Sequence, residues 1–271
     1  MSFVRAFKYA AYVARGKKPF TTGYGVYKEK SIAEVLAAGG FDGNRLRPGY
    51  GVGLDERIVE YPWLFSRLPP EPGKLMDAGS ALNFDYVLAQ PSIQTKQIFI
   101  STLAPEKKRQ LARPNVSYVY EDLRETCFKD DYFDWVVSLS TLEHIGLDNT
   151  RFYTADSSKR ENRPDTYLRV VEQLRRVLKP GGVLYLSVPF GRYRNHGWLQ
   201  VFDAAMVDAL REVFTPTACG ESHFRYERDG WRVSSREQSR DAIYFDYHES
   251  KKHDDDCAAA ARAVVCLELV K

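Results

Sequence analysis

The sequence predicts an α/β fold built on a doubly wound, mostly parallel sheet, and two observations carry this prediction. After residue 73, short apolar runs alternate with stretches of helical periodicity, which is typical of a parallel sheet covered on both faces by right-handed crossovers. Near the end of the chain this alternation stops. The turn dipeptide Asp229-Gly230 and a final apolar run over 262–270 predict that the sheet ends in an antiparallel edge formed by the last strand.

The individual elements follow from the same patterns. Residues 167–178 have apolar side chains at helical spacing and predict a helix. Asp229-Gly230 lies between two short runs, 223–228 and 231–234, and predicts a hairpin. The strands predicted before it cover residues 74–77, 97–101, 116–120, 133–139 and 183–188.

The composition is that of an ordinary globular protein. Of 271 residues, 44% are hydrophobic and 28% are charged, which excludes a disordered or collagen-like chain. With 39 Lys and Arg against 36 Asp and Glu, the net charge of +3 is too small to predict a nucleic-acid partner. No apolar run approaches the roughly 20 residues that span a bilayer. The four cysteines form no C-x-x-C pair and the start of the chain does not resemble a signal peptide, so we expect a cytoplasmic protein.

The first 70 residues differ from the rest. Phe3 and Phe7 recur at helical spacing within a basic stretch, which predicts an amphipathic helix over residues 2–15. Such a helix either packs on the main domain or contacts an anionic membrane surface. The pair Ser31 and Glu34 has the spacing of a capping box and predicts a second helix over 31–38. The proline-rich segment at 69–73 then separates an N-terminal extension, 1–70, from a main domain, 71–271.

Four segments of the main domain have a recognisable form. They read L-M-D-A-G-S at 75–80, E-D-L-R-E-T-C-F at 121–128 followed by D-D-Y-F-D-W-V-V-S at 130–138, S-T-L-E-H-I at 140–145 and L-K-P-G-G-V-L at 178–184. In this order and spacing they resemble the class I S-adenosylmethionine-dependent methyltransferases, in particular the branch that acts on small molecules and sugars. The resemblance implies a seven-stranded, Rossmann-like sheet and S-adenosylmethionine as cofactor.

The resemblance also implies a set of cofactor-binding residues. Gly79 lets the backbone approach the cofactor, Asp77 lies near its positive charges, and Asp122 faces the adenine. Two features depart from the family pattern: Ala81 and Asn83 stand where further glycines are usual, and Thr102 stands where an acid usually binds the ribose. The full set is Asp77, Ala78, Gly79, Ser80, Thr102, Asp122, Leu123, Ser138 and Ser140.

Two histidines at predicted strand ends are candidate catalytic residues. Transfer to a hydroxyl needs a general base, and His196 would approach the acceptor from the side opposite the methyl donor. His144 would lie nearer the cofactor. The polar residues around them, including the long insertion at 146–166, predict substrate binding by Arg151, Tyr153, Arg192, Arg194 and Trp198. We expect no metal site, because the H-E-x-x-x-H spacing at 248–253 is one residue away from the helical zinc motif.

The predicted function is therefore O-methylation of a sugar or another small hydroxyl acceptor, in polysaccharide or secondary-metabolite biosynthesis. One alternative is N- or C-methylation of a small metabolite. Another is a catalytically inactive methyltransferase-like partner module. A module that has lost activity would show departures from the cofactor-binding pattern like those at Ala81, Asn83 and Thr102. The expected partners are the small acceptor and, through the basic helix, a membrane surface.

Overall fold

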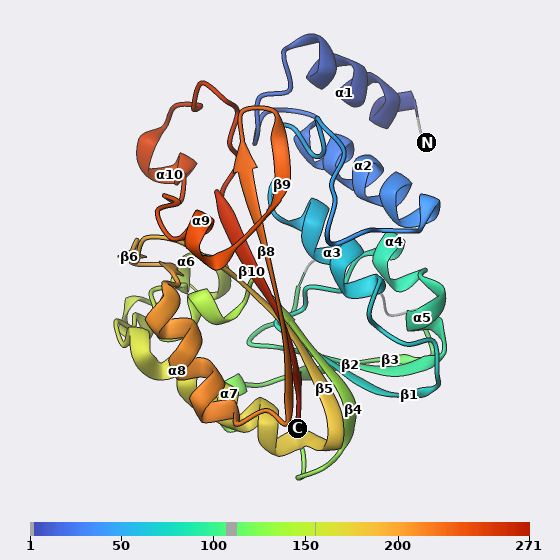
Figure 1. Cartoon of the computed structure of the whole chain (residues 1–271), viewed down its shortest axis with the longest axis vertical. Helices are drawn as coiled ribbons and strands as arrows, with labels where there is room; N and C mark the ends of the chain where they lie inside the picture. The colour runs from blue at the N-terminus through green and yellow to red at the C-terminus, as the bar shows by residue number, and fades with distance from the viewer. Residues whose placement is uncertain (1–2, 107–112, 155) are drawn as a thin grey trace.

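The computed structural model describes residues 3–106, 113–154 and 156–271 (Figure 1). Eight strands form one sheet in the order β3-β2-β1-β4-β5-β10-β8-β9. Their bounds are β1 Gly73–Ala78, β2 Lys96–Thr102, β3 Val116–Tyr120, β4 Phe133–Leu139, β5 Leu178–Pro189, β8 Ala218–Glu227, β9 Gly230–Ser234 and β10 Ala263–Val270. The strands β6 (Arg194–Asn195) and β7 (Gln200–Val201) form a separate pair.

The predicted fold class is confirmed, with two corrections. The first five strands are parallel to one another, whereas β10 is antiparallel to both β5 and β8. The sheet has eight strands instead of the expected seven, because the hairpin at Asp229-Gly230 adds β9 beyond β8. The last strand of the chain is also not an edge strand: β10 lies between β5 and β8, so both its backbone edges are paired.

The helices cover both faces of the sheet (Figure 1). One face packs against the N-terminal helices in a cluster that includes Tyr12, Ile32, Ile58 and Leu75. The other face packs against α7 and α8, with Met76 among its buried residues. Neighbouring strand residues therefore enter opposite cores, as the two-residue period of a strand requires. The helices are α1 Phe3–Ala14, α2 Tyr24–Ala38, α3 Arg57–Phe65, α4 Asp85–Leu88, α5 Pro91–Gln94, α6 Thr150–Tyr153, α7 Tyr167–Val177, α8 Ala204–Phe214, α9 Arg236–Ser239 and α10 Tyr247–Ser250.

The N-terminal segment differs in detail from its prediction. Helix α2 begins at Tyr24 after Gly23, so the capping-box interpretation of Ser31 and Glu34 is wrong, and both residues lie inside the helix. Helix α3 was not predicted. Because α1, α2 and α3 share a hydrophobic cluster with β1 and β2, this segment is packed on the sheet. The division at residue 70 stays a prediction.

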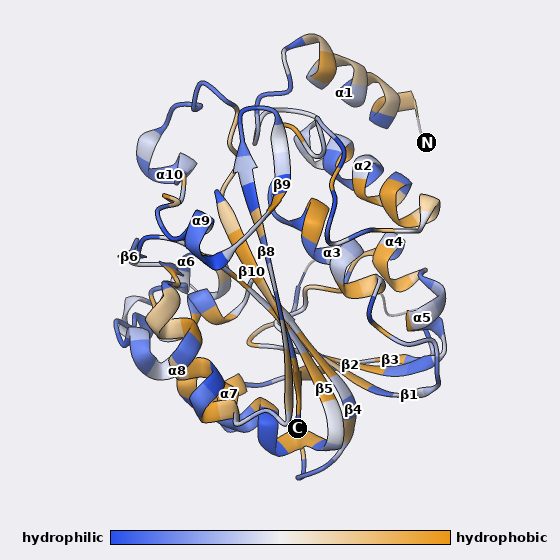
Figure 2. Ribbon diagram, viewed as in Figure 1, coloured by the Kyte–Doolittle hydropathy of each residue, from blue (hydrophilic) through white to orange (hydrophobic). Residues whose placement is uncertain are grey.

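Helix α1 forms at the predicted place, on the outer rim of the molecule (Figure 2). Tyr12 is fully buried against α2, whereas Phe3 and Phe7 are 88% and 68% exposed. The phenylalanines of the predicted apolar stripe therefore do not pack on the main domain. Among the described residues, no helix combines the length and the apolar character needed to cross a membrane.

Candidate functional site

A cavity of about 730 Å³ lies beyond the carboxyl ends of the parallel strands. This is the edge where doubly wound sheets bind ligands. Seven of the residues predicted from the sequence line this cavity. They are the predicted cofactor-binding residues Gly79, Thr102, Asp122, Leu123 and Ser140, the predicted substrate-binding residue Tyr153 and the candidate base His144.

The turn after β1 forms one side of the cavity. Gly79 has φ +111°, and a Cβ on it would lie 2.2 Å from Thr141 Oγ1, so glycine is required there. Asp77 does not line the cavity. Its carboxylate is buried beneath the turn, where it accepts hydrogen bonds from the backbone N–H of Ala81 (3.0 Å) and Leu82 (2.8 Å). Burial raises the pKa of Asp77 to about 7, against the effect of these two bonds.

Other predicted cofactor residues also stand behind the cavity wall. Ala78, Ser80 and Ser138 are buried and are not among the described residues that line the cavity. The hydroxyl of Ser80, at φ +62°, and that of Ser138 have no hydrogen-bond partner among the described residues. Gly79 thus lines the cavity, whereas Ala78, Ser80 and Ser138 are buried behind the residues that line it.

The far end of the cavity is held by an ion-pair network. Asp122 accepts from Arg124 Nε (3.0 Å) and Nη2 (2.6 Å), and Arg124 also pairs with Glu161 at 2.6 Å. Burial acts to raise the pKa of Asp122, but the hydrogen bonds from Arg124 outweigh it and lower that pKa. Glu121 and Glu161 line the cavity as well. Three acidic residues and Arg124 therefore line the end to which the sequence assigned the adenine.

Helix α3 supplies a buried carboxylate that sequence reasoning missed. Glu60 is fully buried, and its Oε1 accepts from the hydroxyls of Ser140 and Ser187, each at 2.6 Å. Its Oε2 pairs with Arg57 at 2.7 Å. The only sequence signal was one acid inside the apolar run R-I-V-E-Y-P-W-L-F at 57–65. Because an unpaired buried acid is costly, such a residue marks an internal polar network.

Two further acids lie close to this network. Burial raises the pKa of Glu143 well above its usual value and that of Glu56 to about 7, and neighbouring carboxylates add to both effects. One oxygen of each is buried without a hydrogen-bond partner among the described residues. The interior next to Ser140 therefore carries several carboxyl groups and the guanidinium of Arg57.

His144 is the histidine that lines the cavity. Its Nδ1 lies 3.0 Å from the carbonyl oxygen of Trp198, which can only accept, so Nδ1 carries the proton and Nε2 keeps its lone pair. Nε2 is 3.9 Å from Glu143 Oε1, beyond hydrogen-bond distance. Burial lowers the pKa of His144 to about 4, so its ring is neutral at pH 7.

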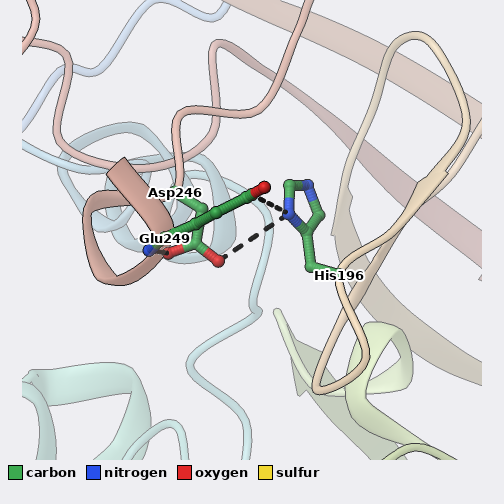
Figure 3. A group of neighbouring side chains, drawn as sticks. All are labelled: His196, Asp246 and Glu249. Carbon is green, nitrogen blue, oxygen red and sulfur yellow. Dashed lines mark hydrogen bonds and ion pairs between the residues drawn. The ribbon is translucent and has the colours of Figure 1, made fainter. Parts of the chain in front are cut away.

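His196, the other candidate base, is not among the described residues that line the cavity. Its ring faces the carboxylates of Asp246 and Glu249 (Figure 3), with Nδ1 3.7 Å and 3.4 Å away respectively. Burial, followed by the charge of Arg194, lowers its pKa. Its role as general base stays a prediction.

The predicted substrate residues are only partly brought together. Tyr153 lines the cavity, whereas the guanidinium of Arg151 lies 4.0 Å above the ring of Trp198. Trp198 donates from Nε1 to Asp246 at 3.0 Å, and Arg194 pairs with Glu249 at 2.6 Å. Arg192 is exposed. Trp198, Arg192 and Arg194 thus belong to the segment beside the cavity and are not among the described residues that line it.

Comparison with known proteins adds an independent result. Residues 78–186 match the family model described as a methyltransferase domain. This segment runs from the last residue of β1 into β5 and includes every described residue of the cavity wall. None of the curated proteins matches the chain.

Solved structures give matches at low identity. The 1,6-didemethyltoxoflavin-N1-methyltransferase of Burkholderia thailandensis is 16% identical, with 82% of this chain and 84% of that chain covered and a TM-score of 0.48. A possible histamine N-methyltransferase from Thermotoga maritima is 12% identical over 79% and 88%, with a TM-score of 0.47. A putative methyltransferase in complex with the Haloferax volcanii Trm112 activator is 16% identical over 78% and 88%, with a TM-score of 0.45.

Proposed function

Since this chain contains an S-adenosylmethionine-dependent methyltransferase domain, we propose that it transfers the methyl group to a hydroxyl of a sugar or another small polar acceptor. The observation that carries the proposal is the state of His144. This neutral ring stands in the cavity wall with its Nδ1 tied to the Trp198 carbonyl and the lone pair of Nε2 available. A hydroxyl acceptor must lose its proton during transfer, and Nε2 can accept it.

The cavity residues fit the cofactor. S-adenosylmethionine presents an adenine amino group and ribose hydroxyls as hydrogen-bond donors, and the carboxylates of Glu121, Asp122 and Glu161 line the cavity beside Arg124. Leu103, Leu123 and Ile145 supply apolar surface for a flat base. When bound, the cofactor supplies an electrophilic methyl group. The chain has then to hold the acceptor in line and take its proton.

The acceptor would lie between the cofactor and the segments that follow β4 and β5. Tyr153 and Lys159 line the cavity from the insertion at 146–166, which supports recognition of a polar acceptor such as a sugar. This is also the basis for proposing a role in polysaccharide or secondary-metabolite biosynthesis. The Glu60 carboxylate fixes the hydroxyl of Ser140, so this part of the wall is preorganised.

A second candidate acceptor is an amine, favoured by a specific observation. Glu56, Glu60 and Glu143 lie near one another in the interior beside Ser140, with Arg57 as their neighbouring cation. A cationic acceptor beside them would favour the ionised form of Glu56 and Glu143, whose pKa values burial raises. The direct test measures S-adenosylhomocysteine released with panels of glycosides, phenols and amines, using the wild-type chain and His144→Gln. Turnover confined to hydroxyl acceptors and lost in His144→Gln supports the proposal; turnover of amines that His144→Gln leaves intact contradicts it.

The remaining alternative is an inactive module. Calorimetric titration with S-adenosylmethionine distinguishes it, because an inactive module that has lost its cofactor would show no heat of binding. We expect binding, since Gly79, Thr102 and Asp122 line one continuous cavity despite the missing glycines at 81 and 83. Absence of binding up to millimolar concentration would favour the inactive module.

We also propose that α1 contacts anionic membranes. Phe3, Val4 and Phe7 are exposed, and Lys8 and Arg15 are exposed on the same short helix and at its end. Apolar side chains next to basic ones are what an interfacial helix needs. Contact at α1 would bring the chain to a lipid-linked acceptor.

A further inference from the structure

Next to the cavity, the side chains of His196, Asp246 and Glu249 point toward a common centre (Figure 3). One ligand atom from each residue lies within 4.8 Å of the ligand atoms of the other two. Among the described residues, this is the one group of three or more His, Cys, Asp or Glu side chains placed closely enough to hold a metal ion. We propose that this group binds one divalent transition-metal ion, of the class of Zn²⁺, Co²⁺ and Mn²⁺, and that the ion fixes the segment after β5 against α10.

The first argument is the condition of His196. Its side chain is 2% exposed, and neither ring nitrogen has a hydrogen-bond partner among the described residues. Buried polar atoms are almost always satisfied, and an ion bound at Nδ1 would satisfy that nitrogen. Nδ1 faces Glu249 Oε2 at 3.4 Å and Asp246 Oδ2 at 3.7 Å. Ligand atoms about 2.0–2.2 Å from one ion in tetrahedral geometry lie roughly 3.3–3.6 Å apart, which is close to these spacings.

The second argument is how the two carboxylates are oriented. Asp246 Oδ1 accepts from the backbone N–H of His248 (2.7 Å) and Glu249 (3.2 Å). Glu249 Oε1 accepts from Arg194 at 2.6 Å. Glu249 is thus held through Oε1 while its Oε2 faces the ring. Asp246 is held through both oxygens, because Oδ2, which faces the ring, also accepts from Trp198 Nε1 at 3.0 Å. Hydrogen bonds of this kind orient the ligands of metal sites. Two carboxylates against the one charge of Arg194 leave the group negative and suited to a cation.

The donor set selects the kind of ion. Imidazole nitrogen with carboxylate oxygen suits Zn²⁺, Co²⁺ and Mn²⁺, whereas Mg²⁺ prefers oxygen ligands alone. The side chain of Glu249 is 56% exposed, so an ion can enter from solvent on that side. Three protein ligands leave at least one position for water or for an oxygen of a substrate.

The ion would act on the active site through Trp198. The indole Nε1 of Trp198 donates to Asp246 Oδ2, and its carbonyl oxygen accepts from His144 Nδ1. An ion held by Asp246 would therefore restrict the position of Trp198, whose carbonyl oxygen sets the tautomer of His144. In this arrangement His196 is a metal ligand, and His144 remains the candidate base of the proposed reaction.

The experiment measures metal directly and does not depend on turnover. The full chain is treated with chelator and dialysed against micromolar Zn²⁺, the bound metal is quantified by elemental analysis, and Co²⁺ absorption reports the geometry. We expect one ion per wild-type chain and a rise in melting temperature with Zn²⁺. His196→Ala and Glu249→Gln should each lower affinity by more than about 100-fold, because loss of an outer partner alone costs about 10–100-fold.

The matched control is His248→Ala, which removes an exposed imidazole from the same short helix and should bind Zn²⁺ like the wild type. The proposal is overturned if the wild-type chain retains no Zn²⁺, or if Glu249→Gln retains it with unchanged affinity. It is also overturned if Mg²⁺ raises the melting temperature as much as Zn²⁺ does. Should His196→Ala fail to fold, Glu249→Gln decides the question, because its half-exposed side chain is not part of the core.

Discussion

The carboxylate of Glu60 accepts a 2.6 Å hydrogen bond from the hydroxyl of Ser140, although the two residues are 80 positions apart. Glu60 comes from helix α3, and Ser140 directly follows β4. The same oxygen accepts from Ser187 near the end of β5. One N-terminal residue thus ties together two strand ends at the edge of the sheet that holds the cavity, and the N-terminal segment takes part in shaping the site.

Removal of this carboxylate should destabilise the fold strongly. Glu60→Ala leaves Arg57 without its 2.7 Å partner in the interior, and breaking a buried ion pair costs about 3–5 kcal/mol. The control is Glu34→Ala, which breaks the exposed pair with Lys30 and should cost about 0–1 kcal/mol. Urea denaturation measures both. A loss for Glu60→Ala no larger than that of the control would show that the network does not contribute to stability.

The turn at Gly79 should be equally intolerant of a side chain. Gly79→Ala adds a Cβ at φ +111° and 2.2 Å from Thr141 Oγ1, so it combines backbone strain with a steric clash. Gly181→Ala is the control, because Gly181 has φ +76° but nothing within 4 Å, and its strain alone is about 1–2 kcal/mol. We expect a larger loss of stability for Gly79→Ala, and cofactor affinity about tenfold lower, equivalent to roughly 1.4 kcal/mol. Equal effects of the two variants would contradict the required contact with Thr141.

The strands could be predicted from the sequence, whereas α3 could not. Each of the first five strands is a short apolar run between turn residues, so local pattern was enough to locate it. Helix α3 follows a glycine-rich loop and contains Pro62, both of which argue locally against a helix. Its apolar residues are buried by distant parts of the chain, and that stabilisation is invisible in a local pattern. The position of β10 between β5 and β8 was missed for the same reason.

The sequence predicted those residues of the site that lie at the ends of strands, and it missed those that come from elsewhere in the chain. Gly79, Asp122, Ser140 and His144 reach the cavity because the carboxyl ends of parallel strands share one edge of the sheet. The carboxylate of Glu60 comes from outside that edge, and only the three-dimensional packing reveals it. The partners of His196 are Asp246, which precedes α10, and Glu249 within α10; both lie far along the chain, so their grouping was equally hidden.

Ribose recognition can be tested at Thr102. In Thr102→Asp a carboxylate would face the cavity in place of a hydroxyl, and one charged hydrogen bond contributes about 1.5–3 kcal/mol. We therefore expect tighter binding of S-adenosylmethionine, measured by calorimetry. The structure also supplies a competing acid, Glu106, whose Oε2 lies 3.1 Å from Asn83 Nδ2 beside the turn after β1. Unchanged affinity in Thr102→Asp together with weaker binding in Glu106→Gln would assign the ribose contact to Glu106.

The proposed membrane contact of α1 depends on two exposed rings. Phe3→Ser together with Phe7→Ser removes apolar side chains that are 88% and 68% exposed, so the fold should be unaffected. We expect the wild-type chain to sediment with phosphatidylserine vesicles at low salt, and the double variant to stay in the supernatant. Phosphatidylcholine vesicles are the lipid control. Equal sedimentation of the wild type and the double variant would exclude α1 as the contact.

The state of His144 makes the most specific prediction for the proposed reaction. Burial lowers its pKa from the usual value near 6.5 to about 4, so the neutral form that can accept a proton is present above pH 4 and is lost as pH falls through that value. The unfolded chain binds a proton at higher pH than the folded chain does, so this group makes stability fall as pH decreases from about 6.5 to 4. NMR titration of the five histidines should show one ring with a pKa near 4 that disappears in His144→Gln. His144→Gln should also lower turnover by about 10²-fold or more, the usual effect of a lost general base. A ring that titrates near 6.5, or a His144→Gln variant with normal turnover of a hydroxyl acceptor, would remove His144 from that role and return it to His196, the base expected from the sequence.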